Sequence, residues 1–420
     1  MIVIPFGKMI TVCAAAGLLF AASAAADSAD KPAAAGPVQP VQGQGHFGKT
    51  AKPIRVHRFV RHDDVGQLAF IGEQRISNDT QYKGTLVGGL SGIDYNPRTH
   101  RWIMISDDRS DHNPARFYTA KLKYDTKSFY SLKLTGVTEL KQPDGTVYPN
   151  SSQYGTTHQG VVPDLESIRF DPSGKSVWYT SEGDRSLGFN PFIDQASMKG
   201  KYLSSYSIPD AVRMDSAAGG SKGFRSNLAL EGSSFTPDGQ FYFTSMEASL
   251  YQDGEISTVD NGSYSRITKY DRDGNIVAQF AYPVDPIPAK PGPGKSADNG
   301  VSDMLAINDH QFLMLERSGV QAADGSYTNY IRIYEADLDS ATDVKDMDAL
   351  KTGSFKPAAK RLVLILNSLH LPKLDNIEGI SWGAKLKNGH DSLVVISDNN
   401  FNDSQVTQLL AFDVLPAAKG

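Results

Sequence analysis

The chain is almost without cysteine. Its single cysteine, Cys13, lies in an apolar N-terminal stretch that has the character of a signal peptide, so the processed chain would contain none. This excludes disulfide bridges, thiolate metal sites and a cysteine nucleophile. A chain of 420 residues is long enough to bury a stable core without such cross-links.

One catalytic motif and an excess of basic charge are also missing. The sequence contains no H-E-x-x-H zinc helix. Its formal net charge is −5, which argues against a nucleic-acid partner, because such binding needs a basic face. Beyond the N-terminus no apolar run is long enough to span a bilayer, so we expect no stable membrane insertion after processing.

The N-terminus has the pattern of an export signal. Lys8 precedes an apolar, alanine-rich run, and Ala22-Ser23-Ala24 and Ala24-Ala25-Ala26 both fit an A-x-A cleavage rule. We therefore predict a signal peptide over residues 1–26 and a periplasmic or secreted protein; an uncleaved membrane anchor is the alternative. Residues 27–50 are rich in alanine, proline, glycine and glutamine and predict a disordered linker. Residues 51–418 form the predicted folded domain.

One pattern recurs along this domain: an acidic residue, a short strand, a turn, a second strand and a second acidic residue. In the two clearest copies the acidic residues are sixteen positions apart, Glu166 with Glu182 and Glu231 with Glu247, and a P-S-G or P-D-G turn lies between them. Three further copies run from Ser91 to Asp107, from Asp303 to Glu316, and from Glu378 to Asp398.

These repeats predict the fold class. After each turn comes a run of aromatic and β-branched residues typical of a buried strand. The spacing leaves room for four strands in each unit, and five copies plus the unassigned stretch 54–76 suggest about six units. We therefore predict an all-β protein, a single β-propeller of about six blades with a site in its central channel. A large sandwich or two barrels with similar hairpins is the alternative.

The recurring carboxylates would form a ring at one mouth of the channel, where they repel one another unless a cation or protons neutralise them. Oxygen ligands favour a hard divalent metal, Ca²⁺ first and then Mg²⁺ or Mn²⁺. The predicted metal ligands are Glu166, Glu182, Glu231, Glu247, Glu316, Glu378 and Asp398. Neighbouring residues predicted to contact the substrate are Asp107, Asp108, Asn399 and Asn400. Alternatively, each carboxylate caps its own hairpin or pairs with an arginine.

Basic residues accompany the acids. Arg109, Arg185 and Arg317 each precede a serine and follow a repeat, and a guanidinium suits phosphate or carboxylate. We predict that these arginines bind an anionic substrate and stabilise developing charge; pairs that close adjacent blades are the alternative. His158 lies shortly before Glu166 and is a candidate general acid or ligand, or an ordinary loop histidine.

In eight ordered motifs the chain resembles the phytase-like family, described as having esterase-like activity of phytase. They span about residues 85–415: S-G-I-D-Y at Ser91, S-D-D-R at Ser106, D-L-E-S-I at Asp164, S-E-G-D at Ser181, L-E-G-S-S-F-T-P-D-G at Leu230, L-E-R-S at Leu315, N-I-E-G-I-S-W at Asn376 and S-D-N-N-F at Ser397. The resemblance implies an exported β-propeller that hydrolyses esters or phosphoesters.

The residues and the resemblance together predict an exported, metal-dependent hydrolase of phosphate or carboxylic esters. A small anionic or ester substrate would bind at the arginines, and water activated by the metal would attack it, with no covalent intermediate. Two alternatives remain: a propeller that binds a ligand without catalysis, and a lactonase of the gluconolactonase type.

Overall fold

The computed structural model describes His62, residues 65–215 and residues 220–417. The predicted signal peptide and linker, residues 1–26 and 27–50, lie outside these residues. None of the helices in the described ranges is long and apolar enough to cross a membrane.

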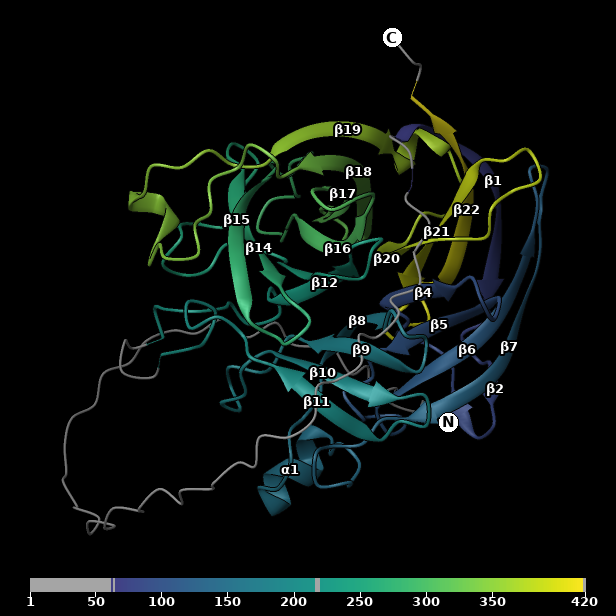
Figure 1. The fold of residues 1–420 in the computed structure, drawn as a ribbon, viewed down its shortest axis with the longest axis horizontal. Helices are drawn as coiled ribbons and strands as arrows, with labels where there is room; N and C mark the ends of the chain where they lie inside the picture. The colour runs from purple at the N-terminus through teal and green to yellow at the C-terminus, as the bar shows by residue number, and fades with distance from the viewer. Residues whose placement is uncertain (1–61, 63–64, 216–219, 418–420) are drawn as a thin grey trace, which may run out of the picture. The chain divides into compact units, whose positions relative to one another are not determined.

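Five antiparallel sheets of four strands each make up the domain (Figure 1). The first three are β4 (Gly92–Asn96), β5 (Arg101–Ser106), β6 (Arg116–Tyr124) and β7 (Phe129–Glu139); β8 (Leu165–Phe170), β9 (Ser176–Ser181), β10 (Phe192–Ser197) and β11 (Tyr202–Tyr206); and β12 (Leu230–Phe235), β13 (Tyr242–Met246), β14 (Ser263–Tyr270) and β15 (Ile276–Val284). The last two are β16 (Gly300–Ala306), β17 (Gln311–Gln321), β18 (Tyr327–Asp337) and β19 (Ala359–Ile365); and β20 (Asn376–Trp382), β21 (Asp391–Asp398), β22 (Thr407–Pro416) and β1 (Val65–Ile76).

The sheets are the blades of a propeller, and the described residues form five blades, not six. The innermost strands β4, β8, β12, β16 and β20 each contact the next, and β20 contacts β4, which closes the ring. The stretch 54–76, counted as part of a sixth unit, instead supplies β1. That strand pairs antiparallel with β22 and becomes the outer strand of the fifth blade. The prediction of an all-β propeller is confirmed, and the predicted blade count was one too high.

The remaining elements are small. A hairpin of β2 (Gln81–Tyr82) and β3 (Thr85–Leu86) follows β1. The helix α1 (Ser151–Thr157) begins with a capping box, in which Asn150 and Gln153 exchange side-chain to backbone hydrogen bonds of 2.9 and 3.0 Å. Two 3₁₀ turns, η1 (Leu350–Thr352) and η2 (Leu366–Leu369), flank β19.

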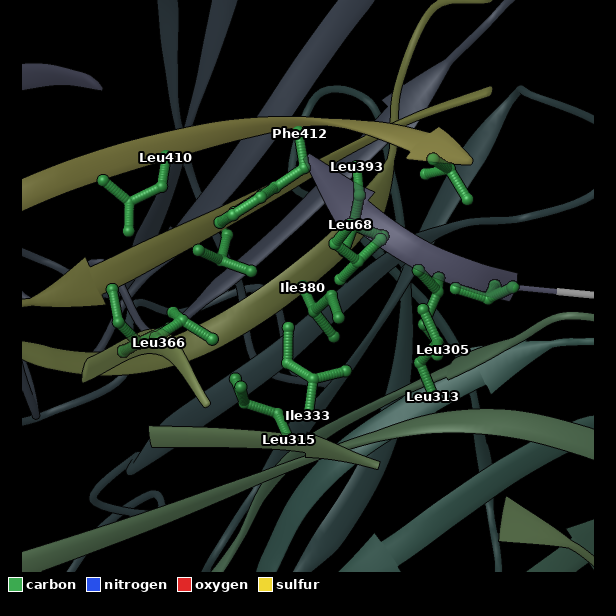
Figure 2. Packing of buried hydrophobic residues seen from close by; sticks show 14 of the residues in the cluster. Leu68, Leu305, Leu313, Leu315, Ile333, Leu366, Ile380, Leu393, Leu410 and Phe412 are labelled. Carbon is green, nitrogen blue, oxygen red and sulfur yellow. The ribbon is translucent and has the colours of Figure 1, made fainter. Parts of the chain in front are cut away.

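The core lies between neighbouring blades, because each blade is buried on both faces. Alternate residues of β17 show this: Leu313 and Leu315 pack toward the fifth blade, whereas Phe312 and Met314 pack toward the third. This explains the continuous apolar runs in the sequence. Figure 2 shows the cluster between the fourth and fifth blades, which includes Leu68, Leu305, Leu313, Leu315, Ile333, Leu366, Ile380, Leu393, Leu410 and Phe412.

One buried arginine joins all five innermost strands. Arg169 on β8 makes two hydrogen bonds of 2.7 Å to the carboxylate of Asp303 on β16. Its remaining donors reach backbone carbonyls of β12, β4, β20 and β16, namely Ser233 at 2.6 Å, Ile93 at 2.7 Å, Ile380 at 2.9 Å and Met304 at 3.0 Å. Asp303 also accepts from the backbone N–H of Ile380 at 2.9 Å. The Arg169–Asp303 pair therefore occupies the centre of the ring, between the two ends of the innermost strands.

Candidate metal and substrate site

The repeated acids come together at the end where the innermost strands begin. β8, β12 and β20 each contain a register shift near their start. The extra residue is Glu231 in β12 and Glu378 in β20, and in β8 the shift spans Glu166 and Ser167. Bulges of this kind redirect a side chain out of the regular pairing. β16 has the same shift, but the residue carried there is Ser302, one position before the Asp303 that the sequence repeat suggested.

A second set of residues lies at the end of the adjacent strand in each blade. The cross-strand register aligns Ser181, Met246, Glu316 and Ser397, so the next residues are equivalent: Glu182, Glu247, Arg317 and Asp398. Asp107 follows β5 at the corresponding place in the first blade. The fourth blade therefore carries an arginine where the others carry a carboxylate.

The structure places two triads of carboxylates close enough to share a cation. In Asp107, Asp164 and Glu166, and again in Glu166, Glu182 and Glu231, one oxygen from each residue lies within 4.8 Å of the others. Glu166 belongs to both triads. Glu247, Glu378 and Asp398 interact electrostatically with them, and we call the whole group the carboxylate cluster. Asp164 was not predicted as a ligand, although it stands two residues before Glu166 in the repeat.

The donor set suits a hard divalent cation. It consists of carboxylate oxygens, and a buried oxygen of Asp107, Oδ1, has no hydrogen-bond partner among the described residues. A buried acceptor without a donor is costly, and a cation would satisfy it. The buried acidic clusters can therefore hold a metal ion.

Burial and mutual repulsion make these carboxyl groups hard to ionise. Burial raises the pKa of Glu166 well above its usual range, and the charges of Glu231 and Asp107 raise it further. Burial also raises the pKa of Glu182 and Glu231 in the same way. Burial raises the pKa of Glu247 to about 8, even though the positive charge of Arg317 lowers it. Without a cation the cluster therefore retains protons near neutral pH.

Two of the three predicted arginines lie at the cluster. Arg317 donates to Glu247 at 2.9 Å and approaches Glu378 to 3.7 Å. Its Nε atom is buried without a hydrogen-bond partner in the described part of the chain. Arg109 bridges Asp164 at 2.7 Å and Asp184 at 2.5 Å. Arg317 is thus surrounded by carboxylates yet keeps one unused donor.

Arg185 and Glu316 lie elsewhere. The guanidinium of Arg185 donates to the backbone carbonyls of Gly220, Lys222 and Phe224 at 3.1, 3.1 and 2.7 Å, away from the cluster. Glu316 is fully buried within the fourth blade, where its carboxylate pairs with Lys360 at 2.5 Å and with Arg332 at 3.5 Å. Glu316 lies one residue before Arg317, which occupies the position equivalent to Glu182 and Glu247. Because the side chains of successive strand residues point to opposite faces, Glu316 does not face the cluster.

The other predicted site residues are dispersed. His158 is an exposed residue at the C-terminal end of α1. Asp108 is buried against Arg116 and accepts from the backbone of His112 and Asn113. Asn399 is also buried and accepts from the N–H of Gly89 at 2.9 Å. Asn400 is exposed beside the cluster, and its N–H donates to Asp398 at 2.8 Å.

A polar cavity of about 870 Å³ opens beside the cluster. Glu378 and Arg317 form part of its wall, together with Asp298, Lys373 and Asn400. Cavities of this size accommodate small-molecule ligands. A substrate in this cavity would meet Arg317 and, of the cluster, Glu378.

The match to a protein-family model decides the family. The model described as "Phytase-like: Esterase-like activity of phytase" matches residues 85–401. The chain belongs to this phytase-like family. The carboxylate cluster of the phytase-like protein falls almost entirely on the motifs that first suggested the resemblance, from Asp107 to Asp398. A comparison with curated protein sequences gave no significant match.

Two solved structures resemble the phytase-like propeller distantly. A thermostable family-43 glycoside hydrolase is 11% identical, with 78% of this chain and 89% of that chain covered and a TM-score of 0.39. A putative 6-phosphogluconolactonase from Bacteroides uniformis is 13% identical, with 82% and 91% covered and a TM-score of 0.33. Similarities this low carry no inference about activity.

The raised pKa values predict how stability depends on pH and metal. A carboxyl group whose pKa rises on folding contributes most below its unfolded-state pKa, and that contribution is lost as the pH rises through the folded-state pKa. In EDTA the melting temperature should therefore fall between about pH 5 and pH 9, since the pKa of Glu247 is about 8. Calcium at about 100 times its Kd should add roughly 2.7 kcal/mol at the alkaline end. Calorimetric scans with and without calcium measure this, and scans that coincide at every pH would contradict the metal site.

Proposed function

We propose that the protein is a metal-dependent hydrolase of phosphate or carboxylic esters, acting at the carboxylate cluster. One observation carries the proposal: two triads of carboxylates able to share a cation belong to a cluster whose Glu378 lines a polar cavity together with Arg317. Cation and guanidinium together form the kind of environment in which an ester oxygen gains negative charge during hydrolysis.

Each group has a proposed role. Glu166, which both triads share, would hold the cation together with Asp107, Asp164, Glu182 and Glu231. The expected cation is Ca²⁺, followed by Mg²⁺ or Mn²⁺. When bound, it would polarise the ester as a Lewis acid and activate water.

Arg317 would bind the anionic part of the substrate. Its guanidinium lines the cavity and can donate to a phosphate or carboxylate oxygen, while its bond to Glu247 fixes the guanidinium in place. Because Arg109 is tied to Asp164 and Asp184, it would orient Asp164 rather than contact the substrate. The predicted signal peptide, residues 1–26, would take this activity to the periplasm or outside the cell.

A substrate screen tests the activity. Purified protein would be assayed with aryl phosphates, phosphodiesters, inositol phosphates, short acyl esters and lactones, in EDTA and in Ca²⁺. Turnover of a phosphate or acyl ester only with metal is expected. Turnover confined to lactones would favour the lactonase alternative, and binding without turnover would favour a ligand-binding propeller.

Replacing Arg317 with methionine should weaken binding of an anionic substrate. The change removes a charge-assisted hydrogen bond, which contributes about 1.5–3 kcal/mol, so we expect KM to rise roughly 10- to 100-fold. Arg185→Met is the matched control, because Arg185 donates to backbone carbonyls away from the cluster. Steady-state kinetics measure both variants. Equal effects on KM would remove Arg317 from the proposed binding site.

A further inference from the structure

The opposite end of the innermost strands contains a second cavity. It has a volume of about 380 Å³, and its walls include residues from the C-terminal halves of all five innermost strands. Glu166 belongs to the carboxylate cluster and Arg169 to this cavity, and on β8 the two are three residues, or roughly 10 Å, apart. The Arg169–Asp303 pair lies between them and fills the centre of the ring. The cavity is therefore separate from the proposed catalytic site.

Four aromatic rings form part of the cavity wall. Tyr95, Phe170, Phe235 and Trp382 contribute to it from β4, β8, β12 and β20, where they occupy the same strand position. Trp382 already holds one flat ring: the imidazole of His62 stacks on it at a centroid distance of 3.9 Å and an interplanar angle of 14°. This surface therefore accepts planar groups, and the faces of Trp and Tyr rings also attract cations.

Two carboxylates, Asp94 and Asp391, contribute to the polarity of the cavity. Asp94 lies in the wall, and its side chain is 18% exposed. Its nearest cation is Arg169 at 4.0 Å, but that guanidinium is already bound to Asp303 by two bonds of 2.7 Å. One arginine thus faces two carboxylates. The other acid in the wall, Asp391, has its own partner in Lys385 at 2.9 Å. Among the described residues, one negative charge in this cavity is therefore left without a balancing cation of its own.

We propose that this cavity is a second binding site, for a small organic cation that carries an ammonium group on an aromatic or apolar body. The ammonium group would pair with Asp94, and the body would lie against Trp382 and Phe235. The site is independent of the ester hydrolysis proposed for the carboxylate cluster, so either can fail without the other.

Tryptophan fluorescence reports binding directly. Of the three tryptophans, Trp102 and Trp178 are buried in the cores between blades, and Trp382 lines the cavity. The full-length protein would be titrated with three probes of the same shape: 2-phenylethylammonium, neutral 2-phenylethanol and anionic 3-phenylpropionate. We expect the ammonium probe to change the emission and to bind at least tenfold more tightly than the alcohol, and the anion to bind most weakly. In Trp382→Phe the emission change should disappear, while calorimetry still detects binding.

Two variants identify the groups responsible. Asp94→Asn should reduce the preference for ammonium over alcohol to less than twofold, because it removes the charge and keeps the shape. Trp382→Leu should weaken the binding of all probes. This second variant keeps the test possible if Asp94→Asn fails to fold. Glu231→Gln, at the opposite end, should leave the binding constants unchanged. Equal affinity for the three probes, no binding of any probe, or a preference that survives in Asp94→Asn would each overturn the proposal.

Discussion

Replacing Arg169 with methionine should reduce the free energy of unfolding by about 3–5 kcal/mol, the usual cost of removing one partner from a buried ion pair. The side chain is almost completely buried and holds the carboxylate of Asp303. Methionine fills similar space but donates no hydrogen bond. The change therefore leaves a buried carboxylate and the carbonyls of four strands without their donor.

Denaturant unfolding followed by far-UV circular dichroism measures this loss. Arg75→Met is a suitable control, because Arg75 is 41% exposed and pairs with Glu73 at the surface, where an ion pair contributes about 0–1 kcal/mol. The double variant Arg169→Met, Asp303→Leu should recover part of the loss, since no buried charge remains. If Arg169→Met and Arg75→Met were equally stable, the central pair would not be what holds the five innermost strands together.

The variants Glu166→Gln and Glu316→Gln should have opposite effects, although the chemical change is the same. Glu166 belongs to both carboxylate triads, so its loss should reduce metal-dependent turnover roughly 100-fold or more. Mutating a residue that only hydrogen-bonds to a metal ligand usually reduces activity by about 10- to 100-fold. In EDTA the same variant should be more stable than the wild type. Burial and neighbouring charges raise the pKa of Glu166, so the folded protein gains when this carboxyl group is removed.

Glu316→Gln should instead lower stability, by about 1–3 kcal/mol, and leave turnover nearly unchanged. Glu316 accepts from Tyr282 of the third blade at 3.0 Å and from Asn299 at 3.1 Å, and it neutralises Lys360 of the fourth blade. Turnover and melting curves of the two variants, each in EDTA and in Ca²⁺, test the assignment. Loss of turnover in Glu316→Gln with full activity in Glu166→Gln would place the active site elsewhere.

The fold could be predicted from the sequence because the repeat is local. Each hairpin carries its own turn and apolar run, so five copies were visible without knowledge of long-range pairing. The blade count was wrong because the strand Val65–Ile76 has no repeat of its own. Its partner is β22, more than three hundred residues away, and no local pattern reveals such a pairing.

The site was harder to predict because a carboxylate can stabilise the fold as readily as it can bind a metal or substrate. Glu316 follows the sequence pattern but lies one residue out of register, so the fourth blade presents Arg317 at the equivalent position. Asp303 also fitted the pattern, yet it holds Arg169 at the centre of the ring. Neither role could be read from spacing, since a register shift of one residue reverses the face of the strand.

The pairing of β1 with β22 also determines the order of folding. Neighbouring strands within most blades can pair as soon as both are available, but the fifth blade needs two segments from opposite ends of the domain. Closing so long a loop is slow, because the chain entropy is lost before the contacts form. During synthesis the first four blades can assemble, but β1 stays unpaired and open to aggregation until its partner β22, which is made last, is available. Ring closure should therefore be the last and rate-limiting step of folding.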